Sequence, residues 1–138
     1  MQPAAVRLAF LAKGAEGICG ITDAVYCAGL PDGDYGHVVM KNGEVYLRDG
    51  SSLAGSSLTM LRALRNAVQF TGLPLEQVYL SYTLVPARQA KVLDRKGTLE
   101  IGKDADFIVI DDQFQLQGTI VRGKAVVNRG MDIGWKQR

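Results

Sequence analysis

The sequence predicts an α/β to α+β fold, on three observations. The apolar spacing in residues 4–13 and 58–71 is typical of helices. A short apolar run at 18–22 follows the first of these helices, which is a helix-to-strand step of the kind α/β folds use. After Lys96 the sequence changes to β-branched runs bounded by turn residues, which predict antiparallel strands.

The first predicted helix, residues 4–13, has a proline near its start and a glycine beyond its end. Residues 18–22 are then interpreted as a buried strand that ends abruptly in Asp23, so that it delivers one carboxylate to the rim of a sheet. Gly20 lies inside this strand, where glycine often marks the close approach of another backbone or a ligand.

A loop and a hairpin follow Asp23. Residues 24–36 contain glycine, proline and aspartate too densely for a regular element, so we expect a surface loop. The apolar runs 38–40 and 45–47 flank Asn42 and Gly43, and Asn-Gly between such runs is a strong hairpin signal.

The clearest helix is predicted over residues 58–71, whose apolar residues fall along one face. Ser56 or Ser57 is well suited to cap its N-terminus, and Gly72 is a natural C-cap.

Prolines mark two further predicted helices, because proline is tolerated in the first helical turn. Pro74 opens one that runs to about Tyr82, and Pro86 opens a short one. Strands are then predicted at 107–110, 119–121 and 125–127, the last two flanking a turn at Gly123-Lys124. Residues 131–138 have no periodicity and are expected to be an extended or frayed end.

The composition excludes several classes of protein. The chain has 138 residues and a formal net charge of +2 from interspersed charges, so no basic stripe for nucleic acid or for a membrane surface is present. No apolar run approaches the roughly 20 residues of a membrane span, and the N-terminus lacks the pattern of a signal peptide. We therefore expect a cytoplasmic protein without nucleic-acid or membrane partners.

Metal ligation by this chain is not expected. Cys19 and Cys27 flank Asp23 and form a conceivable metal pair, but no second cysteine pair or adjacent histidine accompanies them, which favours two buried reduced thiols. His37 is the sole histidine and is expected on the hairpin surface. Arg88 is expected to pair with a helix C-terminus or an acidic partner.

Several short segments occur in one order: Thr-Asp-Ala at 22–24, Leu-Ala-Gly-Ser-Ser-Leu-Thr-Met at 53–60, Pro-Ala-Arg at 86–88 and Gly-Lys-Asp-Ala-Asp at 102–106. From about residue 3 to residue 128, this series resembles the C-terminal part of N-acetylglucosamine-6-phosphate deacetylases, which are metal-dependent amidohydrolases. The last segment is shared by many amidohydrolases, whereas the first two together are much more specific to the deacetylases.

The resemblance implies part of a (β/α)8 barrel and part of a small β-sandwich domain. Residues 1–95 would supply the last strand and the C-terminal helices of an incomplete TIM-type barrel, and residues 96–138 the sandwich strands and tail. A closed barrel takes roughly 250 residues, so this chain cannot form one by itself.

The resemblance also implies roles for individual residues. Asp23 matches the general acid/base, which takes a proton from the water that attacks the acetamide and then protonates the departing amine. Its alternative role is a strand-end carboxylate that caps a turn. The segment Leu53, Ala54, Gly55 and Ser56 matches the loop that contacts the sugar phosphate. A loop of small residues before a helix suits this ligand, although an ordinary capped loop is the alternative.

The full-length family uses a divalent metal, zinc or iron, held by a glutamate and two histidines from earlier strands. These ligands are not found here, so we expect no cofactor in this chain and no deacetylase activity from it alone. The competing hypothesis is a non-catalytic module that binds an amino-sugar phosphate or only self-associates, as a homo-oligomer that buries residues 18–22. A dihydroorotase-like or cytosine-deaminase-like enzyme is a third possibility, disfavoured by the segment at 53–60.

Overall fold

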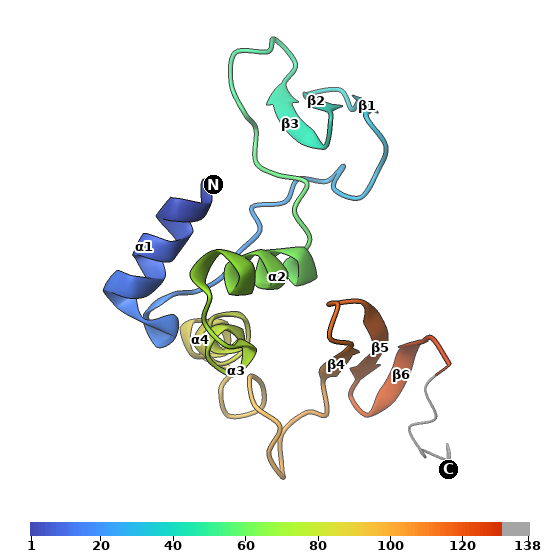
Figure 1. Cartoon of the computed structure of the whole chain (residues 1–138). Helices are drawn as coiled ribbons and strands as arrows, with labels where there is room; N and C mark the ends of the chain where they lie inside the picture. Colours follow the sequence, from blue (N-terminus) through green and yellow to red (C-terminus); the bar gives the residue numbers. More distant parts are fainter. Residues whose placement is uncertain (131–138) are drawn as a thin grey trace.

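The computed structural model describes residues 1–130. Short helices lie between two small antiparallel sheets (Figure 1). In chain order, the elements are α1 Pro3–Lys13, η1 Ala15–Gly17, β1 Gly33–Asp34, β2 Val38–Lys41, β3 Glu44–Leu47, α2 Met60–Thr71, α3 Leu75–Val78, η2 Tyr79–Tyr82, α4 Leu84–Gln89, β4 Phe107–Ile110, β5 Leu116–Val121 and β6 Lys124–Asn128. The fold is mixed α+β.

The first helix is confirmed, but little of its apolar surface is covered. Phe10 is its one buried residue, whereas Leu8 and Leu11 are 67% and 74% exposed. Much of the face predicted to be apolar therefore lies open to solvent.

The strand predicted at residues 18–22 is wrong. A strand needs a neighbouring ladder, and within residues 1–130 this segment has none. Its next residues pair only through an isolated parallel bridge between Ala24 and Ser56. The Gly20 N–H donates to the Ser81 carbonyl at 2.7 Å, so this backbone is held by a helical segment instead.

The predicted hairpin is confirmed. Strands β2 and β3 pair in antiparallel register and are joined by Asn42 and Gly43, both at positive φ, as a two-residue hairpin turn requires. The preceding segment is not entirely loop, because β1 pairs with β2 inside it. This first sheet packs on its own small core, made of Cys27, Val38, Met40 and Val45.

Helix α2 is confirmed from Met60 to Thr71, and Gly72 ends it in the left-handed conformation at φ +70°. The predicted N-cap is wrong. Thr59 caps the helix by accepting from the Arg62 N–H at 3.4 Å. The hydroxyls of Ser56 and Ser57 donate instead to other backbone carbonyls, which lie in distant segments.

The prolines mark helix starts only approximately. Pro74 caps α3, which continues as the 3-10 turn η2 to Tyr82, as predicted in extent. Helix α4 begins two residues before Pro86, at Leu84, so the predicted start is wrong. The proline still lies in the first turn, where its missing N–H has no intrahelical acceptor.

The helices share a core made of Phe10, Leu64, Ala67 and Val78. Ser81 is fully buried beside it, and its hydroxyl donates to the Ala15 carbonyl at 2.6 Å, so burial leaves no unpaired polar group there.

The three predicted C-terminal strands are confirmed as a second sheet, in the order β4-β5-β6. Strand β5 begins at Leu116, earlier than predicted, and the turn to β6 is at Arg122-Gly123, one residue earlier than predicted. The end predicted for residues 131–138 lies outside the described residues. Within residues 1–130, no helix has the length and apolar character to span a membrane.

Candidate functional site

Asp23 lies in an extended segment between the helices and the first sheet, and it is exposed. Its backbone is left-handed, at φ +53°, a conformation that aspartate tolerates better than most residues with a side chain. The carboxylate thus projects from a local bend in the backbone, not from a regular strand.

The loop at residues 53–56 lies against Asp23, so the structure brings together the site residues predicted from the sequence. The Ser56 N–H donates to the Asp23 carbonyl at 2.8 Å, and the Val25 N–H donates to the Ser56 carbonyl at 3.0 Å. The Ala54 N–H donates to the Val45 carbonyl at 2.9 Å, which fixes the other end of this loop on the hairpin.

Gly55 makes the closest approach of this loop to Asp23. A Cβ atom at Gly55 would lie 2.8 Å from the Asp23 carbonyl oxygen and 2.7 Å from Val25 Cγ1, and Gly55 has φ +74°. Both the contact and the conformation therefore require glycine. Leu53, in contrast, is 61% exposed.

The site thus consists of one exposed carboxylate beside a loop of small residues that leads into α2. A carboxylate in this position can accept a proton from a nearby group and return it. The loop ends before α2 begins at Met60, and its Ala54 and Ser56 N–H groups donate within the chain, which leaves those of Leu53 and Gly55 for polar ligand atoms.

A cavity of about 460 Å³ adjoins this loop, and sequence reasoning did not identify it. Gly55 and Ser56 line it, together with residues from α1, α2 and the segment before Asp23, whereas Asp23 itself does not line it. Most of its walls are apolar, with Arg62 and Asn66 among the exceptions. The signal that could have located it is Gly20, whose close neighbour is the ring of Tyr82, another residue of the wall.

The two cysteines differ in burial. Cys27 is fully buried in the core of the first sheet, whereas Cys19 is exposed, so the prediction of two buried thiols is wrong for Cys19. The reason is that Cys19 belongs to the extended segment that no strand covers. Residues 1–130 contain no group of three or more histidine, cysteine, aspartate or glutamate side chains able to hold a metal ion.

The other two candidate polar residues occupy structural positions. His37 is exposed beside the hairpin, as predicted, and its carbonyl accepts from the Arg48 N–H at 3.1 Å. Arg88 forms an ion pair with Glu16 at 3.4 Å, the acidic partner that was expected.

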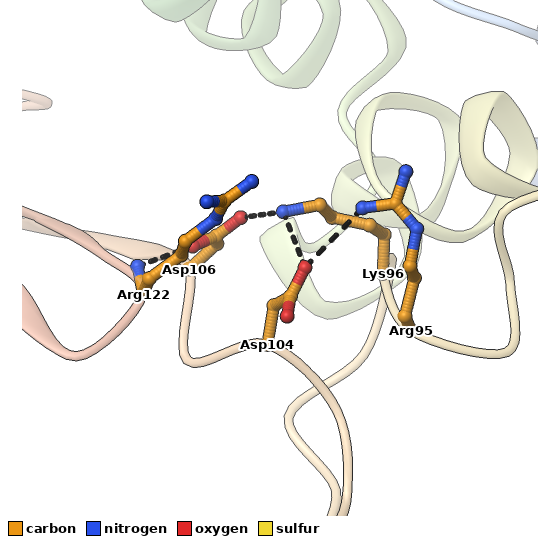
Figure 2. A network of polar contacts seen from close by, with 5 residues as sticks. All are labelled: Arg95, Lys96, Asp104, Asp106 and Arg122. Carbon is orange, nitrogen blue, oxygen red and sulfur yellow. Dashed lines mark hydrogen bonds and ion pairs between the residues drawn. The ribbon is translucent and has the colours of Figure 1, made fainter.

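The segment at 102–106 forms a network of ion pairs and hydrogen bonds (Figure 2). Lys96 Nζ contacts Asp104 at 2.8 Å and also Asp106, while Asp106 accepts from the Arg122 N–H at 2.6 Å. Hydrogen bonds from Lys96 lower the pKa of both carboxyls, and the two carboxylates, Asp104 first, raise the pKa of Lys96. This network joins the segment after α4 to the second sheet, so its role is structural.

The family model described as the amidohydrolase family matches residues 11–126, and the chain belongs to this family. Within it, the chain is homologous to part of N-acetylglucosamine-6-phosphate deacetylases. It is 35% identical to the deacetylase of Vibrio furnissii over 130 residues, covering 91% of this chain and 32% of the relative. It is 41% identical to that of Lysinibacillus sphaericus over 128 residues, covering 90% and 33%. The chain thus spans about a third of these relatives.

Solved structures agree with this assignment. The deacetylase of Thermotoga maritima superposes with a TM-score of 0.84 at 30% identity, covering 93% of this chain and 36% of that one. A mutant deacetylase of Mycobacterium smegmatis in complex with N-acetyl-D-glucosamine-6-phosphate gives a TM-score of 0.83 at 29% identity, covering 93% and 35%. The two small sheets and the helices therefore correspond to a part of the deacetylase structure.

Proposed function

We propose that this chain is the C-terminal portion of an N-acetylglucosamine-6-phosphate deacetylase. The observation that carries the proposal is the contact between Asp23 and the loop at 53–56, because two segments assigned to one site from their sequence meet in space. The homology over nine-tenths of the chain supports it. The substrate class is an amino-sugar phosphate with an acetamide group, and the setting is the cytoplasm.

In this proposal residues 1–95 are the last strand and the C-terminal helices of an incomplete (β/α)8 barrel, and residues 96–138 are β-sandwich strands and tail. Support comes from the change at Lys96, which separates the helical part from the second sheet. The extended segment before Asp23 would occupy the place of the last barrel strand.

Asp23 is the general acid/base in this proposal. Its exposed carboxylate takes the proton of the water that attacks the acetamide carbonyl, then donates a proton to the departing amine as the C–N bond breaks. Leu53, Ala54, Gly55 and Ser56 form the loop that binds the sugar phosphate. The N–H groups of Ala54 and Ser56 already donate within the chain, so the N–H groups of Leu53 and Gly55 are the loop donors left for the ligand. The side chains in residues 1–130 do not fit the zinc or iron of the family, so the chain alone is expected to be inactive.

A hybrid enzyme tests the catalytic proposal. In it, the matching segment of the Vibrio furnissii deacetylase is replaced by this chain, and deacetylation of N-acetylglucosamine 6-phosphate is measured. We expect activity, and we expect Asp23→Asn to lower kcat at least about 100-fold, since general acid–base catalysis contributes 10²–10⁴-fold. Asp112→Asn, a change at another exposed aspartate, is the matched control. A folded, metal-loaded hybrid that is inactive would contradict the proposal.

A non-catalytic module is the second candidate function. The observation that favours it is the exposure of Ile21, and of Leu8 and Leu11 on α1, since exposed apolar side chains suit association more than catalysis. Calorimetry on this chain distinguishes the two kinds of non-catalytic module, a sugar-phosphate binder and an assembly unit. A sugar-phosphate binder gives saturable heat with N-acetylglucosamine 6-phosphate and less with unphosphorylated N-acetylglucosamine, whereas an assembly unit gives none with either.

A further inference from the structure

Every polar group of Ser56 is used inside the chain, and three of its four hydrogen bonds reach Thr22, Asp23 and Val25. We propose that Ser56 is a positioning residue, which fixes the backbone of Asp23 and thereby the direction of its carboxylate. The inference rests on the proposed function of Asp23 and assigns Ser56 a role other than contact with the ligand.

The backbone of Ser56 holds the two peptide units on either side of Ala24, the residue that follows Asp23. Its N–H donates to the Asp23 carbonyl at 2.8 Å, and its carbonyl accepts from the Val25 N–H at 3.0 Å. These bonds form the isolated parallel bridge between Ala24 and Ser56. The bridge therefore lies just beyond the strand predicted at residues 18–22.

The side chain of Ser56 completes this arrangement. Its hydroxyl donates to the Thr22 carbonyl, on the other side of Asp23, and accepts from the Leu58 N–H at 3.1 Å. A hydroxyl offers one donor and two acceptor positions, so the donor is already engaged. A ligand oxygen that needs a donor could use it only by breaking the bond to Thr22.

The left-handed backbone of Asp23, at φ +53°, is what these bonds hold in place. Residues with a side chain rarely adopt this conformation unless their surroundings fix it. Loss of the bond to the Thr22 carbonyl frees the peptide before Asp23 and lets the carboxylate change direction. The loop assigned to the sugar phosphate thus also orients the acid/base.

Ser57 provides a matched control, because it is a neighbouring serine with the same chemistry and a different partner. Its hydroxyl donates to the Gly43 carbonyl, in the hairpin turn. Removing it perturbs the attachment of the loop to the hairpin and leaves the bonds around Asp23 intact.

Nuclear magnetic resonance of the full chain tests the proposal without requiring activity. In Ser56→Ala we expect the Asp23 carbon shifts to leave their left-handed values and the Val25 amide to exchange at least tenfold faster. Ser56→Thr retains the hydroxyl and should restore both, and Ser57→Ala should change neither. If the alanine variant does not fold, Ser56→Cys replaces it, because a thiol is a weak donor.

Unchanged Asp23 signals in the folded Ser56→Ala or Ser56→Cys variant would overturn the proposal, as would an equal change in Ser57→Ala. The hybrid enzyme adds a kinetic readout, in which Ser56→Ala should lower kcat with little change in KM. An inactive parent hybrid overturns the function proposed for the chain but leaves the resonance result to decide the positioning role. An active hybrid in which Ser56→Ala keeps full kcat overturns the positioning role alone.

Discussion

Asp23 and Gly55 face each other, and both have left-handed backbones, at φ +53° and +74°. A residue with a side chain pays on the order of 1 kcal/mol or more for this conformation, which persists only where the surroundings enforce it. The candidate acid/base therefore lies in a locally strained segment that the loop at 53–56 holds together.

The first prediction concerns Gly55→Ala. Its Cβ atom would meet Asp23 and Val25 at 2.8 and 2.7 Å, in addition to the cost of the left-handed backbone. Gly50→Ala is the matched control, because Gly50 has φ +72° and nothing within 4 Å of its Cβ position. Urea denaturation should show a loss of about 1 kcal/mol for Gly50→Ala and at least about 1 kcal/mol more for Gly55→Ala. Equal losses would show that the steric contact is unimportant.

The second prediction concerns Gly20, whose Cβ would lie 2.6 Å from Cζ of Tyr82. Gly20→Ala should lower the free energy of unfolding by about 1–3 kcal/mol, the usual cost of overpacking. The penalty should shrink when Tyr82 is first replaced by alanine, so a double-mutant cycle measures the contact. Additive effects of the two substitutions would contradict it.

The sequence names the candidate site residues, but it does not name the hydrogen bonds that join them. Asp23 and the loop at 53–56 are named from local segments, whereas the hydroxyl of Ser56 bonds the carbonyl of Thr22, 34 positions away. Burial is equally non-local, which is why Cys19 was misjudged. The close approach suggested by Gly20 is present, and the partner is an aromatic ring that local sequence does not reveal.

Among the elements, the hairpin formed by β2 and β3 depends on an aspartate from the loop before it. The Asp32 carboxylate accepts from the N–H groups of Asn42 and, at 3.1 Å, of Gly43. Asp32→Ala should therefore destabilise the chain by about 1 kcal/mol, measured by thermal or urea unfolding. Asp112→Ala, at an exposed position outside the hairpin, should stay within about 0.5 kcal/mol of the parent, and a similar loss there would point to a general charge effect.

The junction between the helical part and the second sheet predicts a pH dependence. The folded state lowers the pKa of Asp104 and Asp106 below the ordinary 3.8, chiefly through hydrogen bonds from Lys96. The contribution of the two carboxylates to the free energy of unfolding is thus fully present above pH 3.8, and it is lost as the pH falls through the lowered pKa values. Lys96, whose pKa is raised above 10.5, stabilises the folded state below that pH and no longer does so once the pH has risen through the raised pKa.

Lys96→Met is the test of this junction. The variant should be less stable than the parent near neutral pH, and the difference in their free energies of unfolding should narrow as the pH falls below 3.8. Urea denaturation at each pH measures this difference. Parallel stability curves for parent and variant across the acidic range would show that the three groups are not coupled.

Elements with a strong local signal were predicted well. Asn-Gly fixed the hairpin turn, and Gly72 fixed the end of α2. The errors occurred where a distant segment competes for the same polar group. Ser56 and Ser57 are good N-cap residues, yet their hydroxyls bond residues far along the chain, and Thr59 caps instead.

At the scale of the whole molecule, the sequence predicted a mixture of helices and strands but did not predict how little they cover one another. Two separate small cores form, one among the helices and one under the first sheet. Figure 1 shows the two sheets apart, with helices between them. The strand expected before Asp23 was inferred from its apolar residues alone, and an apolar run becomes a strand only where a neighbouring ladder exists.

The chain exposes more surface area than a compact monomer of the same mass. The chain exposes 9741 Å² at 14.9 kDa, whereas a compact monomer of that mass exposes about 7,000 Å². The difference is larger than the roughly 800 Å² that each partner buries in an interface of standard size. Leu8, Leu11 and Ile21 are each at least 67% exposed, so apolar side chains contribute to this surface.

We therefore predict that the isolated chain self-associates, most simply as a dimer that buries residues 18–22 and the exposed side of α1. Light scattering at micromolar concentration should give about twice 14.9 kDa. Leu11→Lys combined with Ile21→Lys should shift the mass toward that of the monomer, because both side chains are exposed and their loss leaves the cores intact. Leu99→Lys, at a residue 69% exposed in the segment between α4 and β4, should leave the mass unchanged. A stable, compact monomer of the parent chain would contradict the prediction, and an equal effect of Leu99→Lys would show that net charge, not this surface, controls association.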